Sequence, residues 1–225
     1  MADYGALIDV NGNPFITPDS TPFCLYRKLT ADSVANGSYQ TATVTVPLDD
    51  SYPAIAFSRV RNTDYGGVAL STGRFGGVFS AGGINPYNRP FTMDVYVFAI
   101  FPQTLPKWGM AIWDANRKLV LTNESRVLSD LQAVGTPGNN GGINIDQTLP
   151  GSWAVAPLTM GGTLLQNNNT QPPSIVLVQA YTCCWYNGST SRINAAANNA
   201  GNGGGSVGTV NSGVAITAIN TANYD

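Results

Sequence analysis

Carboxylates are the residues through which this chain could act directly on a substrate. Two of them can hydrolyse a glycosidic bond when they lie within roughly 5–10 Å of each other. The sequence does not show that any two converge in this way, and polar loop or surface positions account for all of them. The candidates are Asp49, Asp50, Asp94, Asp114, Glu124, Asp130 and Asp146.

Other catalytic and metal-binding groups are scarce. The 225 residues include no histidine, which excludes a Ser-His-Asp triad, a Cys-His pair and a histidine metal ligand. Three cysteines cannot build a four-cysteine zinc site. Cys183 and Cys184 are adjacent in an apolar segment, so their side chains would point to opposite faces of a strand. We interpret them and Cys24 as buried free thiols, and we predict no catalytic residue, no cofactor, no metal and no enzyme activity.

Two loop-like segments bear a faint likeness to ligand-binding motifs. Segment 9–20 begins with alternating Asp and Asn, as in a calcium loop, but its glycine is fourth rather than sixth and its twelfth residue is Ser20. The glycine run 201–205 could suggest a phosphate cradle, yet no lysine follows it and no helix is predicted there. We therefore interpret the first as a β-turn and the second as a flexible loop.

Aromatic and basic side chains offer weaker candidates. Aromatic residues could form a sugar-stacking or partner-binding face, although core packing explains most of them. We expect Arg59 and Arg61, which share one face of a strand, to form surface ion pairs with Asp64 or Asp49 rather than to bind phosphate. The aromatic candidates are Tyr65, Tyr87, Trp153, Trp185 and Tyr186.

The segments that would position these residues have the patterns of β-strands. Residues 41–46 alternate with period two, whereas 94–101 and 174–186 are long apolar runs typical of buried strands. Asn-Gly and Gly-Gly pairs mark turns at short intervals. Residues 125–133 fit either two helical turns or a strand. Three Gly/Asn-rich segments, 135–142, 166–173 and 195–208, predict long loops, the last one mobile in an isolated subunit.

An internal similarity suggests how the chain is organised. Asp9–Ser20 resembles Asp114–Ser125 at an offset of 105 residues, with identical Asp, Asn, Thr and Ser at four positions. Each copy predicts a hairpin with an Asx turn; two unrelated hairpins with common turn chemistry remain the alternative. A true duplication would open two modules, with the proline-containing linker 101–106 at their boundary. We predict an all-β fold of one or two β-sandwich modules with short strands and long Gly/Asn-rich loops, divided into residues 1–103 and 104–225.

Composition indicates the kind of partner. Charged residues make up 11 % of the chain and the net charge is −2, which provides no basic surface for nucleic acid or anionic lipid. Few charges also give little protection against association, as expected of a protein whose surface is covered in an assembly. We see neither a signal peptide nor a membrane-spanning stretch, so we predict a cytosolic site of synthesis and no membrane insertion.

The opening residues resemble a known group of proteins. Residues 1–12 resemble the start of small minor tail proteins of long-tailed bacteriophages. The likeness lies in the Tyr4-Gly5 pair, the Asn11-Gly12 turn and the Asp19-Ser20 pair that ends the predicted hairpin. The resemblance covers about the first 130 residues. It implies a structural virion protein of the tail tip or baseplate, assembled in the host cytoplasm as a homo-oligomeric ring around the tail axis, contacting other tail proteins and anchoring tail fibres. The alternatives are a host-glycan-binding module, a capsid decoration protein and a polysaccharide-degrading enzyme.

Overall fold

The computed structural model describes residues 21–64, 67–114, 116–168, 170–201 and 204–225, together with the backbone at 6–7 and 14–16. Within these residues the chain forms strands and one 3-10 turn, η1 (Gly142–Asn144), and no α-helix. The predicted all-β class is therefore confirmed. The calcium-like segment 9–13, Tyr65 and residues 202–203 of the glycine run lie outside the described part, and the interpretations given for them stay predictions.

Two sheets and two separate hairpins contain all the described strands. The eleven-stranded sheet holds β3 (Cys24–Asp32), β6 (Ala54–Arg61), β9 (Thr92–Ala99), β12 (Leu131–Val134), β13 (Asp146–Pro150), β14 (Trp153–Val155), β15 (Thr159–Asn167), β16 (Ser174–Tyr186), β17 (Thr190–Ala197), β18 (Gly205–Asn211) and β19 (Ile216–Asn220). The four-stranded sheet has the order β4 (Val34–Asn36), β5 (Tyr39–Pro47), β8 (Val78–Asn85), β7 (Ala69–Phe75). The hairpins are β1 (Ala6–Leu7) with β2 (Pro14–Ile16) and β10 (Ala111–Trp113) with β11 (Leu119–Thr122).

Strand β9 lies between β3 and β6, and each of its residues is buried. This agrees with the apolar run that predicts a buried strand there. The four-stranded sheet contributes Val46 and Phe79 to the same buried cluster as Val97 of β9. Burial alternates along β5, as the pattern over 41–46 predicts. The two sheets therefore pack face to face in a sandwich-like arrangement.

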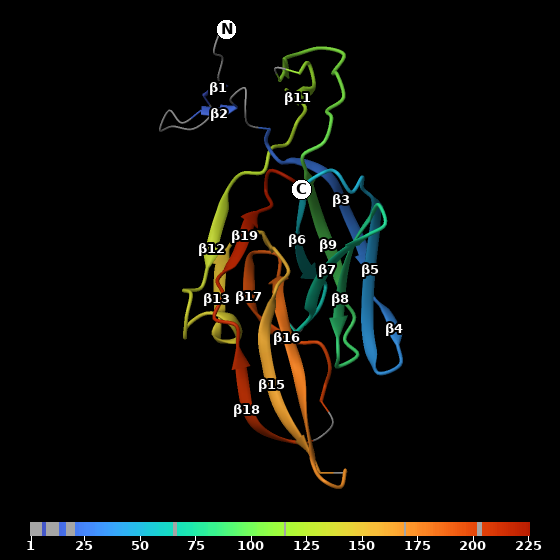
Figure 1. Cartoon of the computed structure of the whole chain (residues 1–225), viewed down its shortest axis with the longest axis vertical. Coiled ribbons are helices and arrows are strands. Elements are labelled where there is room, and N and C mark those ends of the chain that lie inside the picture. Colours follow the sequence, from blue (N-terminus) through green and yellow to red (C-terminus); the bar gives the residue numbers. More distant parts are fainter. Residues whose placement is uncertain are drawn as a thin grey trace.

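The predicted linker and its surroundings can be followed in Figure 1. Residues 100–110 contain no strand. Strands from both sides of the predicted division at 103/104 share the main sheet, and the buried cluster extends from Ala42 to Ala218. The division itself stays a prediction. Figure 1 shows an elongated molecule, with the β10–β11 hairpin at one end and the three strands β15, β16 and β18 at the other.

Both segments of the internal similarity form hairpins, as predicted. β1 pairs with β2 and β10 with β11, each antiparallel and each with a register shift between its last two paired positions. In the second hairpin the carboxylate of Asp114 accepts hydrogen bonds from the backbone N–H groups of Asn116 and Lys118, at 2.9 and 2.8 Å. This is the predicted Asx turn. Both interpretations, a true duplication and two unrelated hairpins with common turn chemistry, stay predictions.

Three segments differ from, or refine, what composition predicts. The loop predicted for 166–173 is wrong at its start, because β15 continues to Asn167. Within 125–133 the strand alternative is correct in its last part, because β12 begins at Leu131, and Val127 forms an isolated bridge with Cys24. The loop predicted for 195–208 is wrong at both ends, because β17 continues to Ala197 and β18 begins at Gly205. Pairing with the neighbouring strand β15 satisfies the backbone of β18, and this outweighs the weak strand propensity of its glycines.

Gly161 of β15 illustrates how closely β18 approaches. Its φ is +130°, and a Cβ atom added there would collide with the backbone carbonyl of Val210. Gly151 also has positive φ, at +84°, but open space surrounds it. Alanine at either position strains the backbone by about 1–2 kcal/mol. We expect urea unfolding to show a loss about 2 kcal/mol larger for Gly161→Ala than for Gly151→Ala, because only the first displaces β18. Equal losses would contradict this account.

Candidate functional site

Of the candidate carboxylates, Asp94 alone lies in a buried cluster of charged groups. It stands on β9 directly opposite Arg59 of β6, and its Oδ2 atom lies 3.1 Å from Nε of Arg59 and 2.9 Å from Nε of Arg61. Arg59 also reaches Asp225, with Nη2 3.1 Å from Oδ1. Lys28 of β3 bonds the same carboxylate at 2.9 Å. We call these five residues the charge cluster.

The predicted partners of the two arginines are therefore wrong, and so is the surface location of Arg59. Asp64 pairs with Arg89 instead, and Asp49 accepts hydrogen bonds from Ser51. The side chain of Arg59 is 6 % exposed and that of Asp94 is 3 % exposed. The register of β6 against β9 places them together inside the sheet, and this register is not visible in either strand alone.

The electrostatics of the charge cluster suit a structural clamp better than acid catalysis. Burial raises the pKa of Asp94, but hydrogen bonds from Arg61 and Thr30 and the charge on Arg59 outweigh it, so the pKa lies below its ordinary value. The pKa of Asp225 is lowered in the same way, by Lys28, Tyr96 and Arg59 against the effect of burial. A general acid needs a carboxyl group whose pKa is raised instead. Both carboxylates therefore remain charged at neutral pH.

Four of the remaining candidate carboxylates have their partners outside the charge cluster. Asp50 pairs with Arg74 at 3.3 Å, Asp146 with Arg192 at 2.6 Å, and Asp130 accepts a hydrogen bond from Asn223. Asp114 caps its own turn. Across the described ranges, no group of three or more acidic or cysteine side chains could hold a metal ion.

The three cysteines are free and buried. Burial raises the pKa of the Cys24 thiol to about 11 and that of Cys183 to about 12, and it also raises the pKa of Cys184. Thiols of this kind are inert, because the thiolate is the reactive form. We expect no thiol to react with a water-soluble disulfide reagent at pH 8 in the folded protein, and three to react in 6 M guanidinium chloride. Reaction of a native thiol within minutes would contradict the buried assignment.

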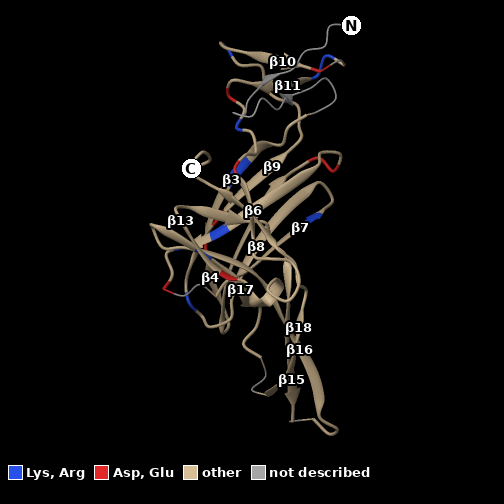
Figure 2. Ribbon diagram, turned by 90° about the vertical axis from the view of Figure 1, so that its left-hand side faces the viewer, with Lys and Arg blue, Asp and Glu red and all other residues tan. Residues whose placement is uncertain are grey.

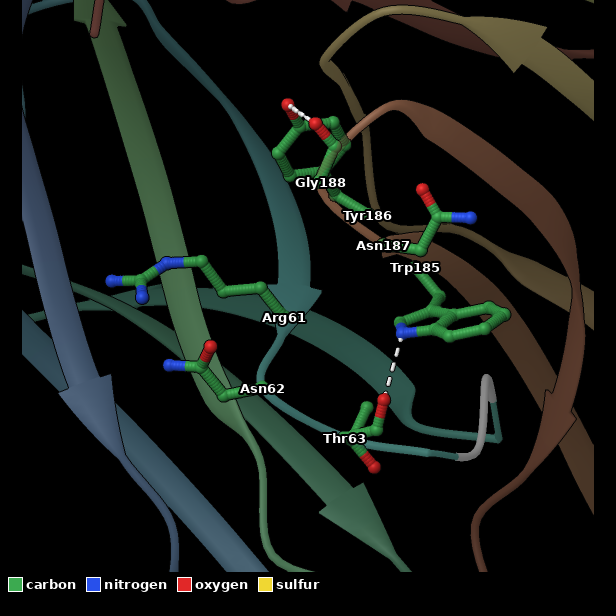
Figure 3. Close-up of a pocket in the computed structure, with 7 residues that line it drawn as sticks. All are labelled: Arg61, Asn62, Thr63, Trp185, Tyr186, Asn187 and Gly188. Carbon is green, nitrogen blue, oxygen red and sulfur yellow. Dashed lines mark hydrogen bonds between the residues drawn. The ribbon is translucent and has the colours of Figure 1, made fainter.

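Trp185 and Tyr186, two of the predicted aromatic candidates, line one pocket of about 350 Å³ (Figure 3). The pocket lies between the end of β6 and the turn from β16 to β17, and Asn62 and Asn187 also line it. The guanidinium group of Arg61 points away from the indole, as its bonds to Asp94 require (Figure 3). Aromatic and amide groups together are suited to a small polar ligand.

Most polar atoms of this pocket already bond within the protein. The indole N–H of Trp185 donates to the carbonyl of Thr63 at 3.1 Å, and the Tyr186 hydroxyl donates to the carbonyl of Gly188 at 2.7 Å. The Asn187 side-chain oxygen accepts from the N–H groups of Ser189 and Thr190 at 3.0 and 2.8 Å. These bonds hold the turn and leave few groups of the pocket for a ligand.

The other aromatic candidates do not join this pocket. Trp153 belongs to β14 and packs against the core, with its indole N–H bonded to the carbonyl of Pro150. Tyr87 lies in a turn and lines a different pocket, beside Arg192 and Asn194. The structure therefore gathers two of the described aromatic candidates and separates the others.

Exposed apolar side chains are the feature that the sequence analysis did not single out. One group lies on the segment 101–125, here called the arm: Leu105, Trp108, Met110 and Trp113. A second group lies on β15, β16 and β18, here called the ribbon: Ile175, Val176, Leu177, Val207 and Val210. The arm and the ribbon lie at opposite ends of the molecule (Figure 1). The sequence feature that could have indicated the exposed arm is the proline-containing linker just before Trp108, because an aromatic residue next to such a linker is not part of a predicted buried strand.

Comparison with known proteins gives no relative: no family model matches the chain, and neither curated proteins nor solved structures show a significant match. In the part of the chain that the structure describes, no helix has the length and apolar character of a membrane span.

Proposed function

We propose that this chain is a structural subunit of a virion, located at the tip or baseplate of a phage tail, and that it works through contacts with other tail proteins. The exposed apolar arm is the observation that carries the proposal. The resemblance of the opening residues to minor tail proteins supports the tail location. The low charge content supports an assembly role, because weak self-repulsion permits close packing of subunits.

Trp108 is the centre of the argument from the arm. Its side chain is 80 % exposed, and Leu105, Met110 and Trp113 are exposed on the same short segment. Several exposed apolar side chains on one short segment are typical of an interaction site. Tryptophan is also enriched among the residues that dominate binding energy at protein interfaces. The arm projects beyond the sandwich, where a neighbouring subunit can reach it (Figure 1).

Imaging of virions tests the location. Virions labelled with an antibody against the chain are expected to show label at the far end of the tail. Label on the head would favour the capsid decoration alternative, and particles without label would contradict a virion role.

A variant of the arm tests the mechanism. Trp108→Ser is expected to lower incorporation into particles at least tenfold while leaving thermal unfolding unchanged, because the side chain makes few contacts in the subunit. Phe75→Ser is the matched control, since this aromatic residue, the last of β7, is 91 % exposed. Equal incorporation of Trp108→Ser and the original chain would contradict the role of the arm.

The pocket beside Trp185 favours a second candidate function, the binding of a host glycan. Its two aromatic rings and two amide side chains are of the types that contact sugars. The purified chain, tested on an array of bacterial surface glycans, would then bind a defined set of them. Absence of binding on the array would remove this candidate and leave the assembly function untouched.

A further inference from the structure

Strand β18 forms an open edge of the main sheet. It pairs with β15 on one side, and no other described strand pairs with it. An open edge presents unpaired N–H and C=O groups, which can form a ladder with another strand. β18 is seven residues long, enough for several such hydrogen bonds.

The other open edges of the described sheets carry features that hinder pairing. β4 has three residues and β12 has four. β3 carries Arg27, Lys28 and Asp32, and β7 carries Arg74. β13 contains Asp146 and ends at Pro150, which cannot donate a hydrogen bond. Short length, charge and proline are three means by which proteins blunt sheet edges, and β-bulges are another.

β18 lacks the first three of these features. Its sequence, Gly-Ser-Val-Gly-Thr-Val-Asn, contains no charge and no proline. The one irregularity is a register shift against β15 that sets Val207 out of the ladder and leaves 208–211 in regular pairing. Val207 and Val210 are 49 % and 45 % exposed, so apolar side chains accompany the open backbone groups.

The chemistry of the ribbon favours another copy of the same ribbon as the partner. β15, β16 and β18 contain no charged residue (Figure 2), so two ribbons approach without Coulomb repulsion and without burying a charge. The ribbon also projects from the sandwich, which keeps the two bodies apart (Figure 1). A two-fold contact needs a single self-complementary surface, and an antiparallel edge provides one.

We infer that β18 pairs antiparallel with β18 of a second copy of this chain, so that two three-stranded ribbons form one continuous sheet. The inference deepens the proposed assembly function by naming one partner and its surface. The two-fold axis passes near Gly208, the middle residue of β18. The arm remains accessible at the far end of each copy for contacts with other proteins.

Sedimentation of the full chain tests the pairing. We expect a dimer whose dissociation constant rises at least tenfold in the double variant Val207→Lys with Val210→Lys, because four positive charges are then brought close together along the shared edge. Val34→Lys is the matched control: this valine is 66 % exposed on β4, an edge strand of the other sheet, and its replacement should leave the dimer unchanged. A chain that stays monomeric at all concentrations would overturn the inference.

A cysteine scan tests the geometry. Ser206→Cys, Gly208→Cys and Val210→Cys each add one accessible thiol, since the native cysteines are buried. A Cβ at Gly208 meets only the Leu164 side chain, at an ordinary 3.6 Å. Antiparallel self-pairing brings equivalent residues within disulfide range only near the axis. We expect rapid intermolecular crosslinking at Gly208→Cys and slow crosslinking at the other two positions. A dimer that crosslinks at none of them would place the contact elsewhere and overturn the inference.

The outcome for this contact is separable from that for the proposed function. A monomeric chain that still labels the tail tip would refute the β18 contact and leave the virion function in place. A crosslinked dimer that is absent from virions would support the β18 contact and refute the virion function. Loss of the dimer on Ile175→Lys, with an intact dimer in the β18 lysine variant, would indicate face-to-face packing of the ribbons and would also refute edge pairing.

Discussion

Asp94→Asn is expected to lower the free energy of unfolding by about 3–5 kcal/mol, the range for removing one partner of a buried ion pair. Asp94 is the carboxylate that both Arg59 and Arg61 contact, and Thr30 donates a further hydrogen bond to it at 2.9 Å. Without its charge, Arg59 remains buried with only the partly exposed Asp225 as counter-ion. Urea or guanidinium unfolding at pH 7, followed by tryptophan fluorescence, measures the loss.

Asp146→Asn is the matched control for this substitution. Asp146 also pairs with an arginine on the neighbouring strand, Arg192, at 2.6 Å, but both side chains are exposed. Exposed pairs contribute about 0–1 kcal/mol, because water and salt screen them. If the two variants lost the same amount of stability, burial of the charge cluster would not be the source of its effect.

The charge cluster also shows where prediction from the sequence ends. The apolar run beginning at Asp94 predicts a buried strand, and β9 lies there. The sequence does not reveal that Arg59 faces Asp94, because this depends on the register between two strands more than thirty residues apart. The sequence gives no sign that Asp225 pairs with Arg59, because this ion pair joins two residues 166 positions apart.

Local composition misleads in a different way in the last third of the chain. Gly, Asn and Ser predict a loop over 195–208, yet β18 begins at Gly205 because β15 offers it a ladder of hydrogen bonds. The apolar character of Trp153 gives no sign that it lies in a three-residue strand against the core. Short strands depend on tertiary pairing more than on their own propensity. The Asx-containing segments between the strands carry strong local turn signals, and both hairpins, β1 with β2 and β10 with β11, were predicted correctly.

The candidate pocket was predictable only in part, because residue type is a local signal and strand pairing is not. Trp185 and Tyr186 stand out by residue type, and the structure places them together. Asn62 reaches the pocket from the end of β6, 123 positions before Trp185. One parallel residue pair, Val60 with Trp185, and the hydrogen bond from the Trp185 indole to the carbonyl of Thr63 bring these ends together. Contacts of this kind have no pattern in the sequence.

Acid is expected to destabilise the protein through the same carboxylates. The pKa values of Asp94 and Asp225 in the folded protein lie below the ordinary 3.8. As the pH falls through 3.8, the unfolded chain therefore binds protons before the folded chain does. The stability that these groups contribute is fully present above about pH 5 and is lost progressively as the pH falls toward their folded pKa values. Urea midpoints measured from pH 7 to pH 2.5 should fall steeply below pH 4.

The variant Asp94→Asn distinguishes the pH dependence of stability that comes from Asp94 from that of the other carboxylates. Asp49 and Asp146 also have lowered pKa values, through hydrogen bonds from Ser51 and Arg192 respectively, and both are exposed. They titrate in the original chain and in the variant alike, so their contribution cancels in the difference. The difference in stability between the two proteins should therefore be largest at pH 7 and shrink as the pH falls below 3.8. A difference that stays constant down to pH 2.5 would mean that Asp94 stabilises the fold through packing, since only a charge can be neutralised by acid.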